Sequence, residues 1–247
     1  MPETYLSIVV PAYNESQRIT ASLERICHYA KSKPLPVEVV LVDDGSTDTT
    51  AEIMLEYEKR HPFVRALRHK PNRGKGYTVR EGVLAAQGEF VLFTDADLSA
   101  PIQEADKLLA AIESSGADAA IGSRALERNL IGVHQPWFRE VAGRSFNRMA
   151  RLMTGLRLRD TQCGLKLFRR GSTRRAFELM RTEGFGFDPE LLFLIVRLKG
   201  NVLEIPVHWN DHPATKVRFW HDSSRMFLDL IGIRWRALTG AYSAPPR

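Results

Sequence analysis

Residues 91–99 read VLFTDADLS, an apolar run of strand character that ends in two carboxylates, Asp95 and Asp97. Side chains alternate along an extended segment, so we expect both carboxylates to face the same side of a strand end. Oxygen ligands of this kind suit Mg²⁺ or Mn²⁺ that carries a diphosphate. Because acidic pairs also end strands that bind no metal, this pair predicts a metal site only together with other motifs.

Two earlier stretches share the design of a buried-type strand followed by a polar turn. They are LSIVV at 6–10 before PAYNE at 11–15, and VEVVLV at 37–42 before DDGSTD at 43–48. Helix-like sequence follows each turn, over 16–30 and 48–60. Strands that alternate with helices predict a parallel α/β sheet, in which ligands bind beyond the carboxyl ends of the strands. We therefore expect the three motifs to meet at one edge of the sheet.

These motifs resemble those of the family 2 glycosyltransferases, inverting enzymes of the GT-A type that use a nucleotide-sugar donor. The resemblance continues through GKG at 74–76, IGSR at 121–124, DTQCGLK at 160–166 and VHWNDHPATK at 207–216. Within the family the chain is most similar to the dolichyl- or polyprenyl-phosphate hexose synthases, particularly the glucosyl kind. The resemblance implies an α/β fold of the GT-A, Rossmann-like nucleotide-diphospho-sugar transferase type, with a mostly parallel sheet flanked by helices.

Length and composition predict one catalytic domain. The chain has 247 residues, 44% of them hydrophobic, and no Pro/Gly/Ser-rich linker separates its motifs. We expect a GT-A glycosyltransferase domain over 1–218 and a C-terminal amphipathic segment over 219–247. Cys27 and Cys163 lack metal-ligand spacing and predict free thiols in a reducing compartment. With no secretory signal and no apolar run of about 18 residues, a cytoplasmic protein is expected.

A basic amphipathic helix is predicted in the second half of the chain. Residues 124–175 contain thirteen Lys or Arg and three acidic residues, and apolar residues from Trp137 to Met153 recur at near-helical spacing. Such a helix either lies in a membrane interface or packs its apolar stripe on the core. The arginine excess and the Trp137–Phe138 pair favour the interface, so we expect peripheral attachment to the cytoplasmic face of a membrane. Residues 219–238 are a second candidate for either role.

The first two motifs supply the predicted nucleotide site. Tyr13 and Glu15 offer a ring and a carboxylate to a nucleobase, and Pro11 ends the strand before them. The resemblance implies that Asp44 contacts base or ribose and that Asp43 supports the loop. The complete set predicted to bind the nucleotide-sugar is Pro11, Tyr13, Glu15, Val42, Asp44, Lys75, Asp95, Ala96, Asp97 and Lys216. PAYNE by itself is equally compatible with a turn and a helix cap.

Three cationic residues are candidates for phosphate contacts. Lys75 lies between Gly74 and Gly76, a spacing that allows the backbone to approach an anion closely, although glycine-flanked lysines also occur in plain surface turns. Arg124, at the end of the IGSR strand, offers a bidentate contact, and Lys216 offers a point charge.

The predicted mechanism follows from the charges of donor and acceptor. A metal on Asp97, helped by Asp95, would neutralise the departing nucleoside diphosphate as a Lewis acid. A lipid phosphate is already an anionic nucleophile and needs only positioning by cations, for which we name Arg124 and Arg139. The resemblance places Asp160 and Gln162 on the acceptor or sugar side. A hydroxyl acceptor would instead require a general base, Asp160 or Asp188, although Asp188 is equally suited to capping a helix that begins at Pro189.

The predicted reaction moves a hexose, first glucose and next mannose, from UDP-glucose or GDP-mannose to polyprenyl or dolichyl phosphate with Mg²⁺ or Mn²⁺. One alternative keeps the donor and uses a hydroxyl of a soluble molecule or glycan as acceptor. Another is a protein that binds nucleic acid or an anionic surface, suggested by a pI near 9.5. Because the acids at 43, 44, 95 and 97 would repel a phosphate backbone, we expect no nucleic-acid partner.

Overall fold

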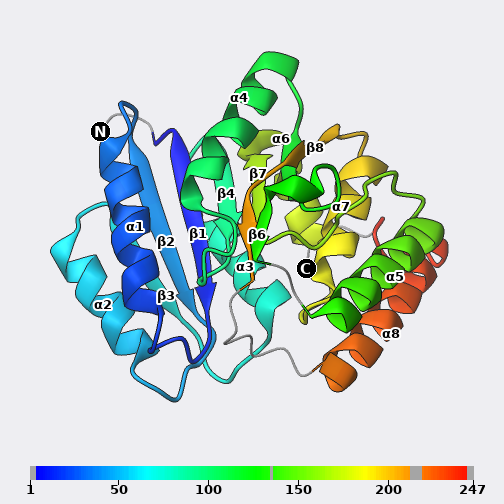
Figure 1. Cartoon of the computed structure of the whole chain (residues 1–247), viewed down its shortest axis with the longest axis horizontal. Helices are drawn as coiled ribbons and strands as arrows, with labels where there is room; N and C mark the ends of the chain where they lie inside the picture. The colour runs from blue at the N-terminus through cyan, green and yellow to red at the C-terminus, as the bar shows by residue number, and fades with distance from the viewer. Residues whose placement is uncertain (1–3, 134–135, 212–218, 244–247) are drawn as a thin grey trace.

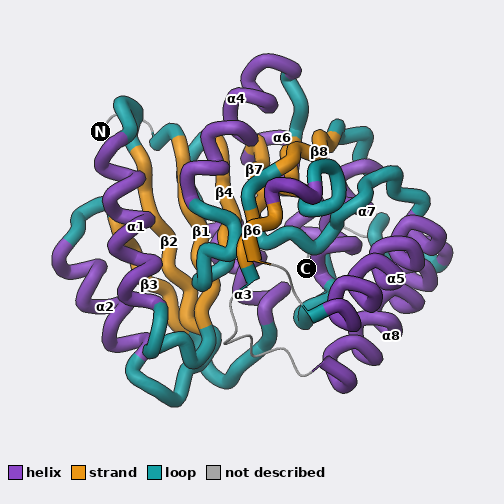
Figure 2. Tube along the Cα trace, in the orientation of Figure 1, coloured by secondary structure: helices purple, strands orange, loops and turns teal. Residues whose placement is uncertain are grey.

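The computed structural model describes residues 4–133, 136–211 and 219–243, and its main feature is one large sheet between two layers of helices (Figures 1 and 2). Seven strands form this sheet in the order β3-β2-β1-β4-β7-β5-β8. Their bounds are β1 Leu6–Ala12, β2 Val37–Asp43, β3 Val64–Arg68, β4 Phe90–Thr94, β5 Ala119–Ser123, β7 Leu165–Arg169 and β8 Val202–Pro206. A small second sheet pairs β6 Ile131–Val133 with β9 Trp209–Asn210.

Neighbouring strands of the large sheet are parallel except at β7, which runs antiparallel to β4 and β5. The predicted mostly parallel α/β sheet is therefore confirmed. Its strands read as continuous apolar runs because both faces are covered. In β1, Ile8 and Val10 join the core cluster on one face, whereas Val9 joins the cluster on the other.

Helices cover the two faces in groups of three. On one face lie α1 Ile19–Ser32, α2 Thr50–Arg60 and α4 Ala105–Ser115, and on the other α3 Lys75–Ala85, α6 Arg170–Leu179 and α7 Phe187–Arg197. Two short 3-10 helices are η1 Ile102–Glu104 and η2 Arg128–Leu130. The helices predicted over 16–30 and 48–60 correspond to α1 and α2.

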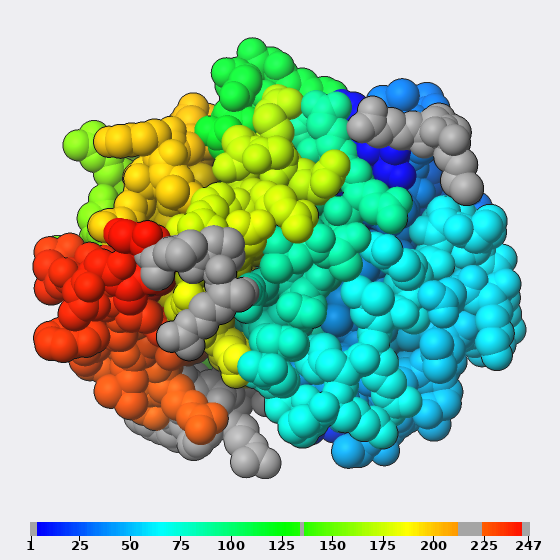
Figure 3. All heavy atoms as spheres, turned by 180° about the vertical axis from the view of Figure 1, so that it is seen from behind, coloured from blue at the N-terminus to red at the C-terminus, as the bar shows by residue number. Residues whose placement is uncertain are grey.

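Two further helices, α5 Trp137–Thr154 and α8 Phe219–Leu238, lie side by side beyond α7 (Figures 1 and 2). Ala150 of α5 and Leu230 and Ile233 of α8 are buried together at their contact. The view from behind shows α8, in orange and red, on the molecular surface (Figure 3). Both predicted amphipathic segments are therefore helices, and part of each apolar stripe is used for mutual packing. None of the helices in the described ranges is long and apolar enough to span a membrane.

The acidic pair lies in a turn, so the expectation of an extended segment at Asp95 and Asp97 was wrong. β4 ends at Thr94, and the amide of Leu98 donates a hydrogen bond to the carbonyl of Asp95 (3.1 Å). Leu98 has a positive φ of 49°, which turns the chain away from the sheet. The directions of the two carboxylates are therefore set by this turn, because strand alternation stops where the sheet stops.

Candidate active site

Loops that carry the predicted motifs gather at one edge of the sheet. Residues 13–15 follow β1, 44–48 follow β2, 95–98 follow β4, and Arg124 follows β5. Because β7 runs in the opposite direction, the segment before it, residues 160–164, reaches the same edge. We call this edge the rim. The expectation that the motifs meet there is confirmed.

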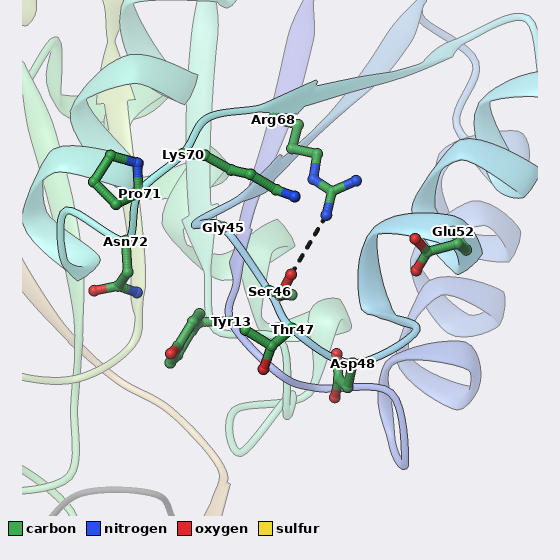
Figure 4. Close-up of a pocket in the computed structure, with 10 residues that line it drawn as sticks. All are labelled: Tyr13, Gly45, Ser46, Thr47, Asp48, Glu52, Arg68, Lys70, Pro71 and Asn72. Carbon is green, nitrogen blue, oxygen red and sulfur yellow. Dashed lines mark hydrogen bonds between the residues drawn. The ribbon is translucent and has the colours of Figure 1, made fainter.

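A pocket of about 830 Å³ opens in the rim beyond β1, β2 and β3 (Figure 4). Arg68 reaches across it, and its Nη2 donates a hydrogen bond to the carbonyl of Ser46 (3.4 Å). The pocket combines the ring of Tyr13 with hydroxyl groups and two cations, which are groups that can stack on a base and bind phosphate. Its lining residues are Tyr13, Gly45, Ser46, Thr47, Asp48, Glu52, Arg68, Lys70, Pro71 and Asn72.

Not every residue predicted for the nucleotide lies at this pocket. Glu15 forms an ion pair with Arg18 instead. Pro11 is buried within β1 opposite Val42 of β2. The side chain of Val42 is fully buried in the core cluster that also contains residues of α3 and does not line this pocket.

Asp43, the last residue of β2, and Asp44, which follows it, both hold loops in place. The carboxylate of Asp43 accepts hydrogen bonds from the amide of Ser46 (3.2 Å) and pairs with Arg68 (3.1 Å). Asp44, which was predicted to contact the nucleotide, is 3% exposed and therefore supports a loop in the way expected of Asp43. Its carboxylate accepts hydrogen bonds from the amides of Arg73 (2.8 Å) and Gly74 (2.9 Å) and from the side chain of Asn72 (2.9 Å).

Each carboxylate of the acidic pair has a cation nearby. Nζ of Lys75 lies 2.7 Å from Oδ1 of Asp95, and Nη1 of Arg18 lies 3.8 Å from Oδ2 of Asp97. Oδ1 of Asp95 is buried and accepts no hydrogen bond within the described part of the chain. Ala96, between the two, is 6% exposed and offers the rim little more than its backbone.

The donor set at Asp95 and Asp97 fits a divalent cation that arrives with a diphosphate. The buried Oδ1 of Asp95, which lacks a hydrogen bond, is an oxygen suited to a metal. Among the residues that the structure describes, no third His, Cys, Asp or Glu completes a protein-only cluster. Mg²⁺ does not require one, since one or two carboxylates plus substrate phosphates and water satisfy its six positions.

Gly164 sets the position of the Asp95 carboxylate. Its carbonyl accepts the amide hydrogen of Asp95 (3.1 Å), and a Cβ at this position would lie 2.0 Å from Oδ2 of Asp95. A side chain at position 164 would therefore push the Asp95 carboxylate out of its present place. This role of Gly164 was not predicted from the sequence, where only Asp160 and Gln162 of the loop were given a place, on the acceptor or sugar side. The contact joins segments that are far apart along the chain.

Lys75 is the first residue of α3 and does not lie in an open glycine loop. A Cβ at Gly74, where φ is +103°, would lie 2.6 Å from the carbonyl oxygen of Glu183. A Cβ at Gly76 would lie 2.5 Å from the carbonyl oxygen of Thr182. The two glycines therefore permit close packing on the 182–187 segment, whereas the sequence analysis had expected them to admit an anion.

The charge state of Lys75 is set by its neighbours. Burial lowers the pKa of the ammonium group, but the carboxylates of Asp95 and Asp188 outweigh this effect and the pKa is raised. Lys75 is therefore a cation at the rim at neutral pH.

Arg124 and Asp160 form a bidentate pair at the end of β5. Nε and Nη2 of Arg124 donate to the two carboxylate oxygens (2.7 and 2.9 Å), and Asp160 is 2% exposed. Burial raises the pKa of Asp160, but the attraction of Arg124 is stronger and the pKa falls to about 2. A carboxylate with so low a pKa is a weak general base at neutral pH. The amide of Gln162 also donates to Asp160 (3.2 Å), so this residue is part of the same loop.

Asp188, in the first turn of α7, is held by a buried lysine. Its Oδ1 lies 2.7 Å from Nζ of Lys166, whose side chain is 0% exposed. Burial raises the pKa of Asp188, and the two lysines Lys166 and Lys75 oppose that rise. With 5% exposure it faces the interior below the rim.

One predicted cation, Arg139, has no described contact with the acidic pair or with Arg124. Arg139 lies in the first turn of α5, and no contact within the described ranges joins it to Asp97 or Arg124. Lys216 lies outside the described residues. Conversely, the structure adds Arg18 and Asn72, which lie outside the quoted motifs, and Lys166, the last residue of DTQCGLK, which had been given no role.

Comparison with known proteins places the chain among enzymes that use nucleotide-sugars. A family profile described as glycosyl transferase family 2 matches residues 7–177. The dolichyl-phosphate beta-glucosyltransferase of Drosophila melanogaster is 37% identical over 98% of this chain and 78% of its own length. The enzymes of the same name from Saccharomyces cerevisiae and Homo sapiens are 35% and 34% identical, over 97% and 98% of this chain and 77% and 78% of their own lengths.

Solved structures show the same fold at low sequence identity. Glucosyl-3-phosphoglycerate synthase from Mycobacterium tuberculosis, in complex with UDP, superimposes with a TM-score of 0.70 at 18% identity over 94% of this chain and 80% of that one. A mannosyltransferase from Pyrobaculum calidifontis, in complex with GDP-Man and Mn²⁺, gives 0.60 at 18% identity over 93% and 65%. These likenesses confirm the fold expected from the sequence.

Proposed function

We propose that this chain, which belongs to glycosyl transferase family 2, transfers glucose from UDP-glucose to the phosphate of dolichol or a related polyprenol, with inversion at the sugar carbon. Glycosyltransferase activity is that of the family, and the prediction of an enzyme is confirmed. The lipid acceptor is supported by relatives named for it, which match nearly the whole chain. The structural observation that carries the proposal is the rim, where an acidic pair fit for a metal and a diphosphate lies among cations.

The pocket of Figure 4 is the proposed nucleoside site. Tyr13 is 41% exposed and presents its ring to the pocket, and Arg68 and Lys70 border it with positive charge. Lys75, Asp95 and Asp97 follow along the rim, so a nucleotide whose base lies against Tyr13 would extend its diphosphate toward them. We assign uridine as the base because the relatives are glucosyltransferases and a structural neighbour is solved with Mn²⁺ and UDP-glucose. GDP-mannose is the second donor to test, since another neighbour holds GDP-Man.

Asp95 and Asp97 are the residues that would hold Mg²⁺ or Mn²⁺, which when bound supplies Lewis-acid neutralisation of the diphosphate. Cationic side chains of the protein near this pair also stabilise the negative charge of the diphosphate. Lys75 and Arg18 lie beside the two carboxylates and can follow the negative charge that grows as the nucleoside diphosphate leaves. Lys216 is a further proposed phosphate contact from the sequence.

A phosphate acceptor suits this rim better than a hydroxyl acceptor. A lipid phosphate is anionic at neutral pH, so the protein only has to hold it in line with the sugar carbon. Arg124, oriented by Asp160, is the proposed cation for this task, with Arg139 and Gln162 as its proposed partners on the acceptor side. A hydroxyl would need a base, and Asp160 and Asp188 are each held by a cation.

We propose that α5 and α8 rest on the cytoplasmic face of the membrane that contains the acceptor. Along α5, Trp137, Val141 and Leu152 are exposed and recur with Arg144 and Arg148 on one helical face. Along α8, the exposed large apolar residues are Phe227, Leu228, Ile231, Trp235 and Leu238. An exposed apolar patch bordered by arginines is the composition of a surface that lies in a lipid interface. We call these two faces the α5–α8 surface.

A transfer assay tests the proposal. Purified protein, Mg²⁺ or Mn²⁺, and labelled UDP-glucose or GDP-mannose are incubated with a short polyprenyl phosphate, and label in the lipid is counted. We expect transfer from UDP-glucose, a loss of roughly 100-fold or more in Asp97→Asn, and unchanged transfer in the control Asp106→Asn, whose carboxylate pairs with Lys33 away from the rim.

The other outcomes separate the alternatives. Transfer from GDP-mannose alone would change the hexose and keep the acceptor. Metal-dependent UDP binding without any label in the lipid would contradict the proposed lipid acceptor. A hydroxyl acceptor would then be tested next.

A further inference from the structure

We propose that Lys75 is the resident counter-ion of Asp95, which it neutralises while the donor site is empty and leaves for the diphosphate when Asp95 takes a divalent cation. The inference deepens the proposed function and rests on its metal site at Asp95 and Asp97. According to this inference, Lys75 competes with the metal ion for the carboxylate of Asp95 and also contacts the diphosphate of the donor.

The contact between Lys75 and Asp95 is close but replaceable. Nζ of Lys75 lies 2.7 Å from Oδ1 of Asp95, the same separation that joins Lys166 to Asp188. The side chains of Lys75 and Asp95 are 24% and 29% exposed, so solvent and a ligand can reach the pair. An ion pair that solvent reaches is easier to exchange than a fully buried one, because its charges are already partly hydrated.

The backbone keeps the ammonium group of Lys75 at the rim even after exchange. Lys75 begins α3 directly after Gly74, whose amide is bound by the carboxylate of Asp44 (2.9 Å). Its Nζ lies 5.5 Å from the ring centroid of Phe93 and 5.9 Å from that of Phe185. These two cation–π contacts favour a position of the ammonium group beside the acidic pair.

Lys166, a second lysine near Phe93, is the fixed counter-ion of Asp188 and can be compared with Lys75. Lys166 lies over the same ring of Phe93 (5.6 Å), is 0% exposed, and donates a hydrogen bond to the carbonyl of Cys163 (2.5 Å) while pairing with Asp188 (2.7 Å). Lys166 is therefore held beside Asp188 by complete burial and by its hydrogen bond to the carbonyl of Cys163. The side chain of Lys75 is 24% exposed and makes no hydrogen bond to a backbone carbonyl within the described residues, so of these two lysines it is the one that can be exchanged.

Charge balance predicts the consequence. In the nucleotide-free protein a divalent cation must displace an ammonium group from Asp95, so it binds weakly by itself. A diphosphate offers that ammonium group another anion, so metal and nucleotide each strengthen the binding of the other. Removal of the lysine charge leaves Asp95 bare, which should tighten the binding of the metal alone and weaken its coupling to the nucleotide.

Metal binding to the full chain tests this directly. Binding of Mn²⁺ is measured by calorimetry and by the loss of free Mn²⁺ signal in electron paramagnetic resonance, with and without UDP. For Lys75→Met we expect affinity for Mn²⁺ alone to rise at least tenfold, and the gain on adding UDP to shrink by a similar factor. Lys75→Arg keeps the charge and should behave like wild type. Lys33→Met removes a lysine of equal exposure, 23%, from a Lys–Asp pair outside the rim and should change neither value.

Mn²⁺ affinity in Lys75→Met that equals or falls below wild type would overturn the inference, and so would the absence of Mn²⁺ binding in every variant at millimolar concentration. Asp95→Asn should abolish the tight site of Lys75→Met, and its persistence would place the metal elsewhere. Failure of the proposed function looks different, because glucose transfer to the lipid is absent while Lys75→Met still tightens Mn²⁺ binding. Circular dichroism of each variant confirms that the fold is retained.

Discussion

At the scale of residues, the rim consists mostly of carboxylates that already have partners. Asp43 and Asp44 hold loop amides, and Asp160 holds Arg124. Asp95 and Asp97 differ because each lies beside a cationic side chain, and Asp97 accepts a single loop hydrogen bond within the described residues, from the amide of Ser99 (3.0 Å). A buried carboxylate with several hydrogen bonds is expensive to detach, so the acidic pair is the place where a ligand can be accepted without unfolding a loop.

Because Gly164 lies close to the Asp95 carboxylate, a substitution at this position should weaken metal binding while it leaves the stability of the fold nearly unchanged. In Gly164→Ala the new Cβ would lie 2.0 Å from Oδ2 of Asp95, the end of a flexible side chain that can rotate away. We expect thermal unfolding within about 3 °C of wild type and binding of Mn²⁺ with UDP weakened at least tenfold. Gly171→Ala, where nothing lies within 4 Å, is the control. Unchanged binding in Gly164→Ala would show that the position of Asp95 is not critical.

The Arg124–Asp160 pair makes stability depend on pH in acid. The pKa of Asp160 is about 2 in the folded protein and about 3.9 in an unfolded chain. Because the folded pKa is the lower one, the pair stabilises the fold above about pH 4, and this contribution disappears as the pH falls toward 2. Urea unfolding should show wild type losing about 2–3 kcal/mol more than Asp160→Asn between pH 5 and pH 2. Parallel losses in both proteins would contradict the assignment.

At the scale of elements, α5 and α8 each divide their apolar residues between two partners. Ala150, Leu230 and Ile233 are buried in the contact between the helices, with Phe146 and Met153 packed against it. The remaining apolar residues of both helices are exposed. Helix α8 is also joined to α7, because Arg236 pairs with the buried Glu190 (3.2 Å). The C-terminal segment is thus packed on the rest of the chain and still presents an apolar face.

Two leucines of α8 should separate packing from surface function. Leu230 is 0% exposed and Leu238 is 69% exposed. We expect Leu230→Ala to reduce the free energy of unfolding by about 2–4 kcal/mol, because it leaves a cavity between α5 and α8. Leu238→Ala should change it by less than about 0.5 kcal/mol. Chemical denaturation checks both, and equal losses would refute the packing described for α8.

At the scale of the whole molecule, the α5–α8 surface and the pocket of Figure 4, the proposed nucleoside site, lie on opposite sides of the sheet's midline. The pocket opens beyond β1, β2 and β3, whereas α5 and α8 pack beyond α7 (Figures 1 and 4). The acidic pair and Arg124 follow β4 and β5, between these two regions. A membrane-bound phosphate approaching from the α5–α8 side and a water-soluble donor bound on the other side would meet at the middle of the rim.

Vesicle binding tests this orientation. Trp137→Ala combined with Trp235→Ala removes two side chains that are 77% and 68% exposed, and should weaken binding to vesicles with anionic lipid by at least about tenfold. Binding of wild type should also fall as salt is raised, because part of it comes from arginines. Leu35→Ala combined with Leu55→Ala, exposed apolar residues beside α1 and on α2, should have no effect. An equal effect of both pairs would reject the α5–α8 surface as the contact.

The sequence by itself determined the sheet, its polar edge and the family, because these depend on local patterns. Apolar runs ending in PAYNE, DDGSTD and TDADLS predicted the strands and the rim, and helical spacing predicted α5 and α8. Only the tertiary structure decided which carboxylates are committed to loops, that Gly164 makes room for Asp95, and that Lys75 pairs with it. These contacts join residues far apart along the chain, and their geometry is fixed by packing, which no local pattern encodes.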